Sequence, residues 1–121
     1  MTRRLIMARR KKVTEVGLPP LPKEVWTPLG MVEVLEVEGL ADSSTAETLC
    51  GQWDNGARQI RIRQGLQPVA AWQTLAHELM HAILHDAGAS LPDRQLEAVC
   101  DAFGSFMAAF VLAGAPFPFG E

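Results

Sequence analysis

The sequence has few cysteines and no long apolar run. Its two cysteines, Cys50 and Cys100, are too few for a disulfide scaffold and do not form a Cys-x-x-Cys pair, so we expect two reduced, buried thiols. No apolar run approaches the roughly 18 residues of a membrane helix, and the first residues lack the apolar core and cleavage site of a secretory signal. We therefore expect a cytoplasmic protein with no membrane partner.

The composition is that of one globular domain behind a basic tail. The chain has 121 residues, of which 48% are hydrophobic and 21% are charged, so neither a disordered chain nor a pair of domains is indicated. Residues 1–23 hold seven of the eleven Lys and Arg residues and have a net charge of +6, whereas residues 24–121 have a net charge of −9. We expect residues 1–23 to form a basic, Pro-rich tail and linker that can contact nucleic acid weakly, and residues 24–121 to form a single domain.

Strand-like segments precede the helical part of the chain. Residues 31–38 mix β-branched residues with glutamates, and their alternation slips once, which indicates a bulge or an edge position. Residues 48–53 and 58–63 flank Asn55-Gly56, the strongest short signal for a β-hairpin. In the second arm, isoleucines alternate with arginines, so one face should be buried. We expect a small antiparallel sheet of about three strands.

Two helices are expected after the hairpin. The first begins near Gln67, with a proline at an early position where its missing N–H costs nothing, and ends at Gly88. The second follows a capping sequence at residues 90–93 and runs to about Leu112. The first helix carries an apolar stripe at helical spacing, which we assign to the core: Trp72, Leu75, Ala76, Leu79, Ile83 and Leu84. The predicted fold class is therefore α+β, with the small sheet packed on two helices.

The first helix contains a His-Glu-x-x-His motif. His77 and His81 are four residues apart, so they project from one face of a helix, where two imidazoles can bind one tetrahedral zinc ion. Glu78 is poorly placed to join the metal but well placed to take a proton from a water molecule that the metal activates. Histidines at this spacing can also line a polar seam without any metal, so the second helix decides between these interpretations.

Glu97 and Asp101 are four residues apart on the second helix, inside an otherwise apolar stretch where lone carboxylates are costly to bury. A hydrolytic zinc ion takes three protein ligands and a water molecule, and Glu97 is the natural third ligand after two histidines. Asp101 can then accept the N–H of a zinc-binding imidazole and fix its tautomer. The alternative is a partly exposed helix face with two solvated carboxylates.

The combined pattern resembles a known class of enzymes. His77-Glu78-x-x-His81, followed sixteen residues later by Glu97-x-x-x-Asp101, is similar to the gluzincin metallopeptidases, in which the downstream Glu is the third zinc ligand and the Asp orients the first histidine. The hairpin ending in Ile-Arg-Ile, then Thr-Leu-x-His-Glu-Leu-x-His-Ala-Ile-Leu-His, then Glu-x-x-x-Asp-x-Phe resembles the small phage and prophage peptidases of the ImmA/IrrE type. This second resemblance covers roughly residues 48–107.

The sequence departs from these families at several positions. No tyrosine occurs in the chain, so the phenol that stabilises the oxyanion in some gluzincins is absent, and His85, one turn beyond His81, is the nearest substitute donor or substrate contact. Gly104 stands where the ImmA/IrrE type often has Ala. The extended metzincin pattern does not fit, because it needs Gly at Leu84 and His at Ala87.

The resemblance implies an enzyme of a bacterium or a phage-infected cell that hydrolyses peptide bonds with one zinc ion per chain. Glu78 would be the general base, and zinc would polarise the scissile carbonyl. The substrate would be a protein or peptide, by family analogy a helix-turn-helix repressor, and residues 58–63 could bind it by strand addition if they form an outer strand. Two other classes remain open. One is a regulatory binding module that keeps the zinc without cleaving, and the other is a structural protein without metal.

Overall fold

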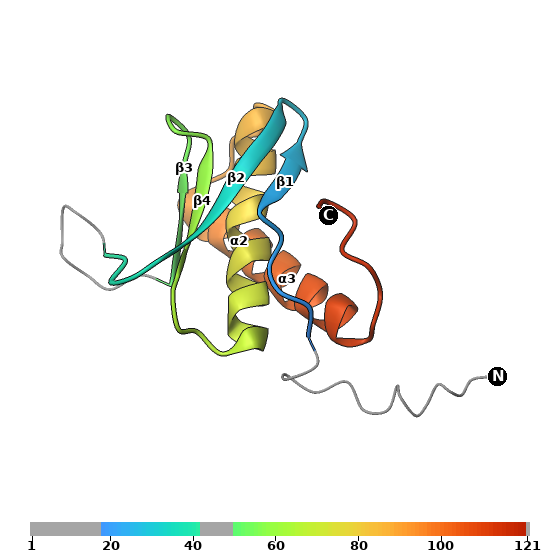
Figure 1. Ribbon diagram of the computed structural model, residues 1–121. Helices are drawn as coiled ribbons and strands as arrows, with labels where there is room; N and C mark the ends of the chain where they lie inside the picture. Colours follow the sequence, from blue (N-terminus) through green and yellow to red (C-terminus); the bar gives the residue numbers. More distant parts are fainter. Residues whose placement is uncertain (1–17, 42–49, 121) are drawn as a thin grey trace.

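The computed structural model describes residues 18–41 and 50–120 (Figure 1). In this part of the chain, four strands are followed by two helices, which confirms the predicted α+β class. The elements are β1 (Glu24–Thr27), β2 (Gly30–Val37), β3 (Gly51–Asp54), β4 (Gln59–Arg63), α2 (Pro68–Asp86) and α3 (Asp93–Leu112).

The four strands form one mixed sheet with the order β1-β2-β4-β3. β1 pairs antiparallel with β2, and β3 pairs antiparallel with β4, but β2 and β4 run parallel. The prediction of about three antiparallel strands was therefore wrong in the strand count and in this central pairing. β4 pairs with β2 on one side and with β3 on the other, and its Ile60 and Ile62 are fully buried, whereas the residues of β3 are half-buried. The arm at residues 58–63 is thus an inner strand, and β3 lies at one edge of the sheet.

β2 contains no bulge. Its register against β4 runs without interruption from Glu33, opposite Gln59, to Val37, opposite Arg63. β1 pairs only with residues 30–33, so the second half of β2 has no strand on that side within the described ranges. This edge position explains the slip in alternation, because Glu36 can remain exposed there.

The two helices lie on one face of the sheet, with α2 against the strands and α3 packed on α2 (Figure 1). The bounds of α2 match the prediction closely, and Gly88 follows it with a left-handed φ of 74°. Most of the predicted stripe is buried, while Ile83 and Leu84 are half-buried. α3 begins without a side-chain cap, because Pro92 occupies the N-cap position, so the predicted capping sequence at residues 90–93 does not act as one.

Both ends of the described chain pack against this unit. Leu18 and Leu21 are partly buried against the core, and Trp72 Nε1 donates a hydrogen bond to the carbonyl of Pro19 at 3.0 Å. At the other end, the backbone N–H of Trp26 donates to the carbonyl of Phe119 at 2.8 Å, which covers the outer edge of β1. The proline-rich segment therefore contacts the core where it is described. Residues 1–17 lie outside the described residues, and the predicted boundary at residue 23 stays a prediction.

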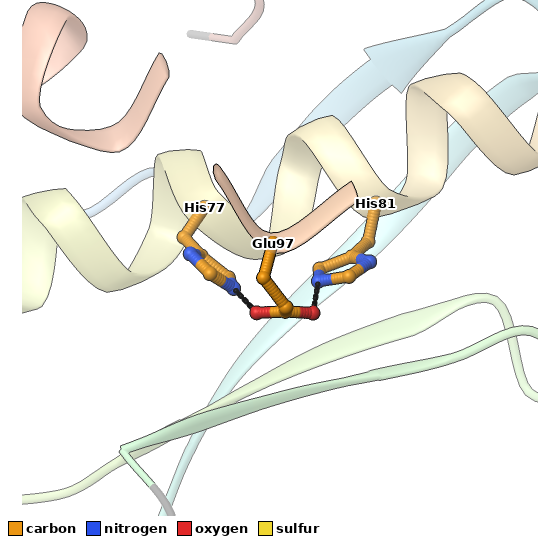
Figure 2. A group of neighbouring side chains, drawn as sticks. All are labelled: His77, His81 and Glu97. Atoms are coloured by element: carbon orange, nitrogen blue, oxygen red, sulfur yellow. Dashed lines mark ion pairs between the residues drawn. The ribbon is translucent and has the colours of Figure 1, made fainter. Parts of the chain in front are cut away.

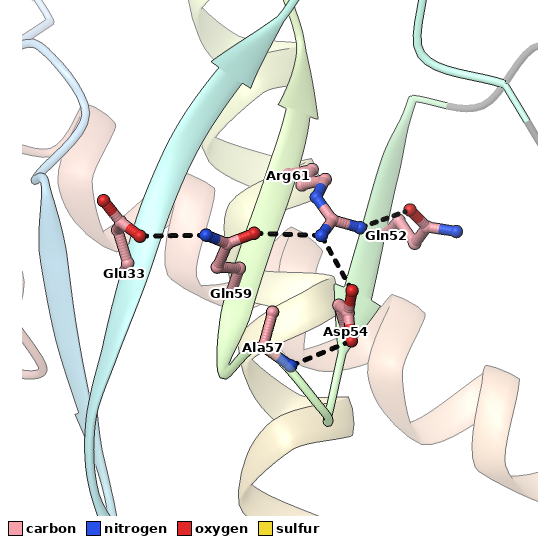
Figure 3. Close-up of polar contacts among 6 residues, drawn as sticks. All are labelled: Glu33, Gln52, Asp54, Ala57, Gln59 and Arg61. Carbon is pink, nitrogen blue, oxygen red and sulfur yellow. Dashed lines mark hydrogen bonds and ion pairs between the residues drawn. The ribbon is translucent and has the colours of Figure 1, made fainter.

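The sheet face opposite the helices is polar (Figure 3). Arg61 lies at its centre and donates hydrogen bonds to Gln52 at 3.1 Å, Asp54 at 2.7 Å and Gln59 at 2.9 Å, while Gln59 donates to Glu33 at 3.0 Å. These contacts link β2, β4 and β3 across the face. The predicted alternation of the second hairpin arm, with isoleucines inward and arginines outward, is confirmed.

A second polar group ties the hairpin turn to the end of α2. Arg58 adopts a left-handed φ of 53° after the predicted turn, and its guanidinium donates to the Asp86 carboxylate at 2.7 Å. The Thr27 hydroxyl also donates to Asp86, whose side chain is fully buried. The Arg58 hydrogen bond holds the pKa of Asp86 below its usual range. Three elements, β1, the β3–β4 turn and α2, are thereby joined at one point.

Among the described helices, α3 alone is long and apolar enough by length and composition to cross a membrane. The core helix of an ordinary domain passes the same test, and α3 packs on α2. The two cysteines are free, and Cys100 is fully buried as predicted. The expectation for Cys50 was wrong, because it is exposed beside the start of β3.

Candidate metal centre

Three side chains from the two helices converge on one point (Figure 2). Because His77 and His81 lie one turn apart on α2, both rings face the first half of α3. Nε2 of His77 lies 3.2 Å from one oxygen of Glu97, and Nε2 of His81 lies 3.0 Å from the other oxygen. The structure therefore brings the three predicted ligands together, although Glu97 is sixteen residues from His81 and twenty from His77 in the sequence.

The donor set suits a zinc ion. One ligand atom from each of the three residues lies within 4.8 Å of the others. Tetrahedral zinc, with bonds of about 2.0–2.2 Å, holds its ligand atoms about 3.3–3.5 Å apart, so small side-chain adjustments suffice. Burial lowers the pKa of His81, which favours the neutral imidazole that binds metal. The residues present could thus hold a metal through two nitrogens and a carboxylate.

Asp101 lies on the far side of the first histidine. Its Oδ1 is 2.8 Å from Nδ1 of His77. An N–H on Nδ1 leaves the lone pair on Nε2, the nitrogen that faces Glu97, so this contact orients the ring for metal binding. The structure thus gives Asp101 the position expected from the spacing.

The burial expected for the two carboxylates was wrong. The side chains of Glu97 and Asp101 are 54% and 73% exposed. Their apolar neighbour Val99 is also exposed, because the first half of α3 covers little of the core. The cost of burying a charge therefore does not explain these residues, and their contacts with the two histidines do.

Glu78 is the buried carboxylate of the site. Its side chain is 12% exposed, and its Oε2 lies 4.0 Å from Nε2 of His77, outside the three-residue group. Burial raises the pKa of Glu78 to about 7, with attraction to His77 opposing the rise and repulsion from Glu97 adding to it. The backbone N–H of Trp53, on the edge strand β3, also contacts this carboxylate. A carboxyl group with this pKa can both take and return a proton near neutral pH.

Two glycines that sequence reasoning did not assign allow the elements to approach. A Cβ on Gly104 would lie 2.8 Å from the backbone oxygen of Gln73, so α3 can pack this close to α2 only with glycine there. A Cβ on Gly51 would lie 2.4 Å from Cγ2 of Thr74 and 3.1 Å from Cγ of Glu78, which fixes the approach of β3 to the site. An isolated glycine inside a helical or strand pattern is the signal that could have identified both.

His85 lies at the edge of the site. It is exposed, and its ring meets the ring of Trp53 edge-on at 6.3 Å. His85 and His81 line the same cavity, but His85 does not belong to the three-residue metal group. Its predicted role as an oxyanion donor or substrate contact stays a prediction.

Comparison with known proteins agrees with this geometry. The family model of Peptidase_M78, described as the IrrE N-terminal-like domain, matches residues 40–117. That range covers more than half of the chain and includes both helices of the site, so the chain belongs to this family of peptidases. The predicted resemblance to the ImmA/IrrE type is confirmed. No match was found among curated proteins or among solved structures.

Proposed function

We propose that this chain is a zinc-dependent metallopeptidase of the gluzincin type, with His77, His81 and Glu97 as metal ligands. The observation that carries the proposal is the convergence of both Nε2 atoms on Glu97, at 3.2 and 3.0 Å. Asp101 orients His77 from the other side. A seam of histidines without a metal would not require this orientation of both rings toward one carboxylate.

The residues divide the reaction between them. A bound zinc ion supplies Lewis-acid activation of a water molecule and of the scissile carbonyl. Glu78, buried next to the ligands, takes the proton of the attacking water and returns it to the leaving amine.

The edge strand β3 offers a place for an extended peptide. The backbone N–H of Arg63 donates to the carbonyl of Cys50, so residues 50, 52 and 54 direct their backbone groups toward β4. The backbone groups of Gly51 and Trp53 therefore face away from β4, where the N–H of Trp53 contacts Glu78. A substrate chain pairing there would pass next to the metal ligands. This replaces strand addition at residues 58–63, which are not at the edge.

The proposed substrate is a protein or peptide, with a helix-turn-helix repressor as the first candidate by family analogy. A cytoplasmic location, in a bacterium or a phage-infected cell, is part of the same proposal. We also propose that the basic tail contacts nucleic acid weakly. The net charge of +6 on residues 1–23 supports this part of the proposal.

The decisive experiment compares wild type with Glu78→Gln. The amide keeps the shape of the side chain but cannot take a proton, so we expect one zinc per chain in both proteins and a loss of about 100-fold or more in cleavage of a repressor or peptide library. His81→Ala is the control that should lose the metal itself. Equal cleavage by wild type and Glu78→Gln would refute the role of Glu78 as general base. Zinc-dependent regulation without cleavage would favour a binding module.

A further inference from the structure

One face of α3 is apolar and exposed. The helix packs on α2 through the face that contains Gly104, and the opposite face, which we term the outer face, points away from α2. Although α3 is apolar along its length, only 28% of its most apolar stretch is buried. The outer face consists of eight exposed residues, of which seven are apolar and none is charged: Gln95, Ala98, Val99, Ala102, Phe106, Ala109, Phe110 and Ala113. An exposed apolar patch of this kind marks a binding surface.

The spacing on the outer face is that of a seam between two helices. Positions 95, 99, 102, 106, 109 and 113 follow one another at alternating steps of four and three residues. Side chains at this spacing lie in one row along a helix and pack into the row of a second helix. The outer face therefore fits a helix of another molecule.

The sizes of the side chains make the outer face complementary to itself. If a second α3 lies antiparallel, with a two-fold axis at the height of residue 104, Phe106 meets Ala102 of the second copy, and Val99 meets Ala109 of the second copy. A large side chain thus meets a small one in each of these layers. One surface that serves both copies in this way is the form of interface that two-fold symmetry requires.

The charges of α3 favour the same arrangement. Its four charged residues all lie in the first half, at positions 93, 94, 97 and 101, with a net charge of −2. Parallel pairing would bring these two acidic halves together, whereas antiparallel pairing places each beside the uncharged half of the other copy. The outer face also contains no lysine or arginine that would attract an anionic lipid surface.

The aromatic surface available to such a pair is substantial. Phe106 and Phe110 stack on each other with ring centroids 6.1 Å apart, and they are 62% and 37% exposed. Because a phenylalanine offers about 200 Å² for burial, the two expose roughly 200 Å² in each copy. The six other residues extend the interface toward the ~1,000 Å² that a specific contact needs, which is the size of a reversible dimer.

We propose that the outer face of α3 binds the outer face of a second copy of this chain, with the two helices antiparallel. Sedimentation of the zinc-free protein over a range of concentrations tests this. We expect the mass to rise reversibly from the 13.2 kDa of one chain to twice that value. A protein that stays monomeric at every concentration overturns the proposal, and so does a monomer that instead binds phosphatidylcholine vesicles through Phe106.

Three variants connect the dimer to the outer face. Phe106→Glu should weaken it by about 100-fold or more, because the carboxylate would be buried without a partner. Phe106→Leu should weaken it by no more than about tenfold. The matched control is Leu29→Glu, at a side chain 70% exposed between β1 and β2, which should leave the dimer unchanged. A dimer that persists in Phe106→Glu would overturn the assignment of this face.

Cross-linking tests the antiparallel order. Val99→Cys and Ala109→Cys are prepared separately, each with Cys50→Ser, since Cys50 is exposed whereas Cys100 is buried. We expect a disulfide between the two proteins when they are mixed under oxidising conditions, and little cross-linking of either one alone. Parallel helices would cross-link Val99→Cys with itself, and this result would overturn the antiparallel dimer.

Discussion

Gly104→Ala tests whether the contact between the helices sets the geometry of the metal centre. The added Cβ would lie 2.8 Å from the backbone oxygen of Gln73 and 3.5 Å from Cβ of His77. A normal C···O contact is about 3.3–3.6 Å, so α3 must retreat by roughly 0.5 Å or more. Overpacking of this kind costs about 1–3 kcal/mol, whereas replacing a helical glycine by alanine gains about 1 kcal/mol. The expected net effect is a destabilisation of about 1 kcal/mol.

The assay is thermal unfolding of the zinc-free protein together with a measurement of zinc affinity. A loss of about 1 kcal/mol lowers Tm by about 4–8 °C in a domain of this size. Zinc affinity should also fall, because Glu97 and Asp101 move away from His77 with α3. Ala109→Gly, at an exposed position of the same helix, measures the helix-propensity term alone. If Gly104→Ala raised Tm and left zinc affinity unchanged, the close helix contact would not exist as described.

The remaining predictions concern two carboxylates. Asp101→Asn should keep the fold, because Asp101 is 73% exposed, but weaken zinc affinity by about 10- to 100-fold through the lost orientation of His77. Cys100→Ser is its control and should leave zinc affinity nearly unchanged, since burial raises the pKa of Cys100 to about 12 and keeps it a neutral thiol. Asp86→Asn should make the free energy of unfolding depend less on pH in the acid range. The pKa of Asp86 is lowered by Arg58, so its stabilisation is complete above the unfolded pKa of about 3.9 and is lost as pH falls below it. Unfolding free energies of both proteins between about pH 5 and pH 2 check this, and parallel curves would contradict it.

The parts of the fold that depend on local sequence were predictable. The bounds of α2 follow from Pro68 at its start and Gly88 after its end, and each signal acts within a few residues. The hairpin likewise follows from the turn between its arms. The candidate site was predictable because two residues four apart on a helix project from the same face. This rule applies to His77 and His81 on α2 and to Glu97 and Asp101 on α3.

The parts that depend on contacts between distant residues were not predictable. β1 has only four residues, and its place in the sheet depends on pairing with β2. The parallel pairing of β2 with β4 joins segments more than twenty residues apart, which no local pattern encodes. The turn also differs from the two-residue form that Asn-Gly favours, since Arg58 takes the left-handed conformation and reaches Asp86. That choice depends on a partner on another element.

The distribution of buried residues in α3 separates the candidate metal centre from the core. Every buried residue of this helix lies at Cys100 or beyond, and residues 93–99 contribute none. Glu97 therefore sits in the half of α3 that has little apolar contact, where local opening costs the least free energy. Its contacts with His77 and His81 hold that half against α2, and metal binding would add its own free energy to them. Changes at Glu97 should consequently affect metal binding and the docking of this half of α3 but not the core, whereas changes at Gly104 act on metal binding and the core together.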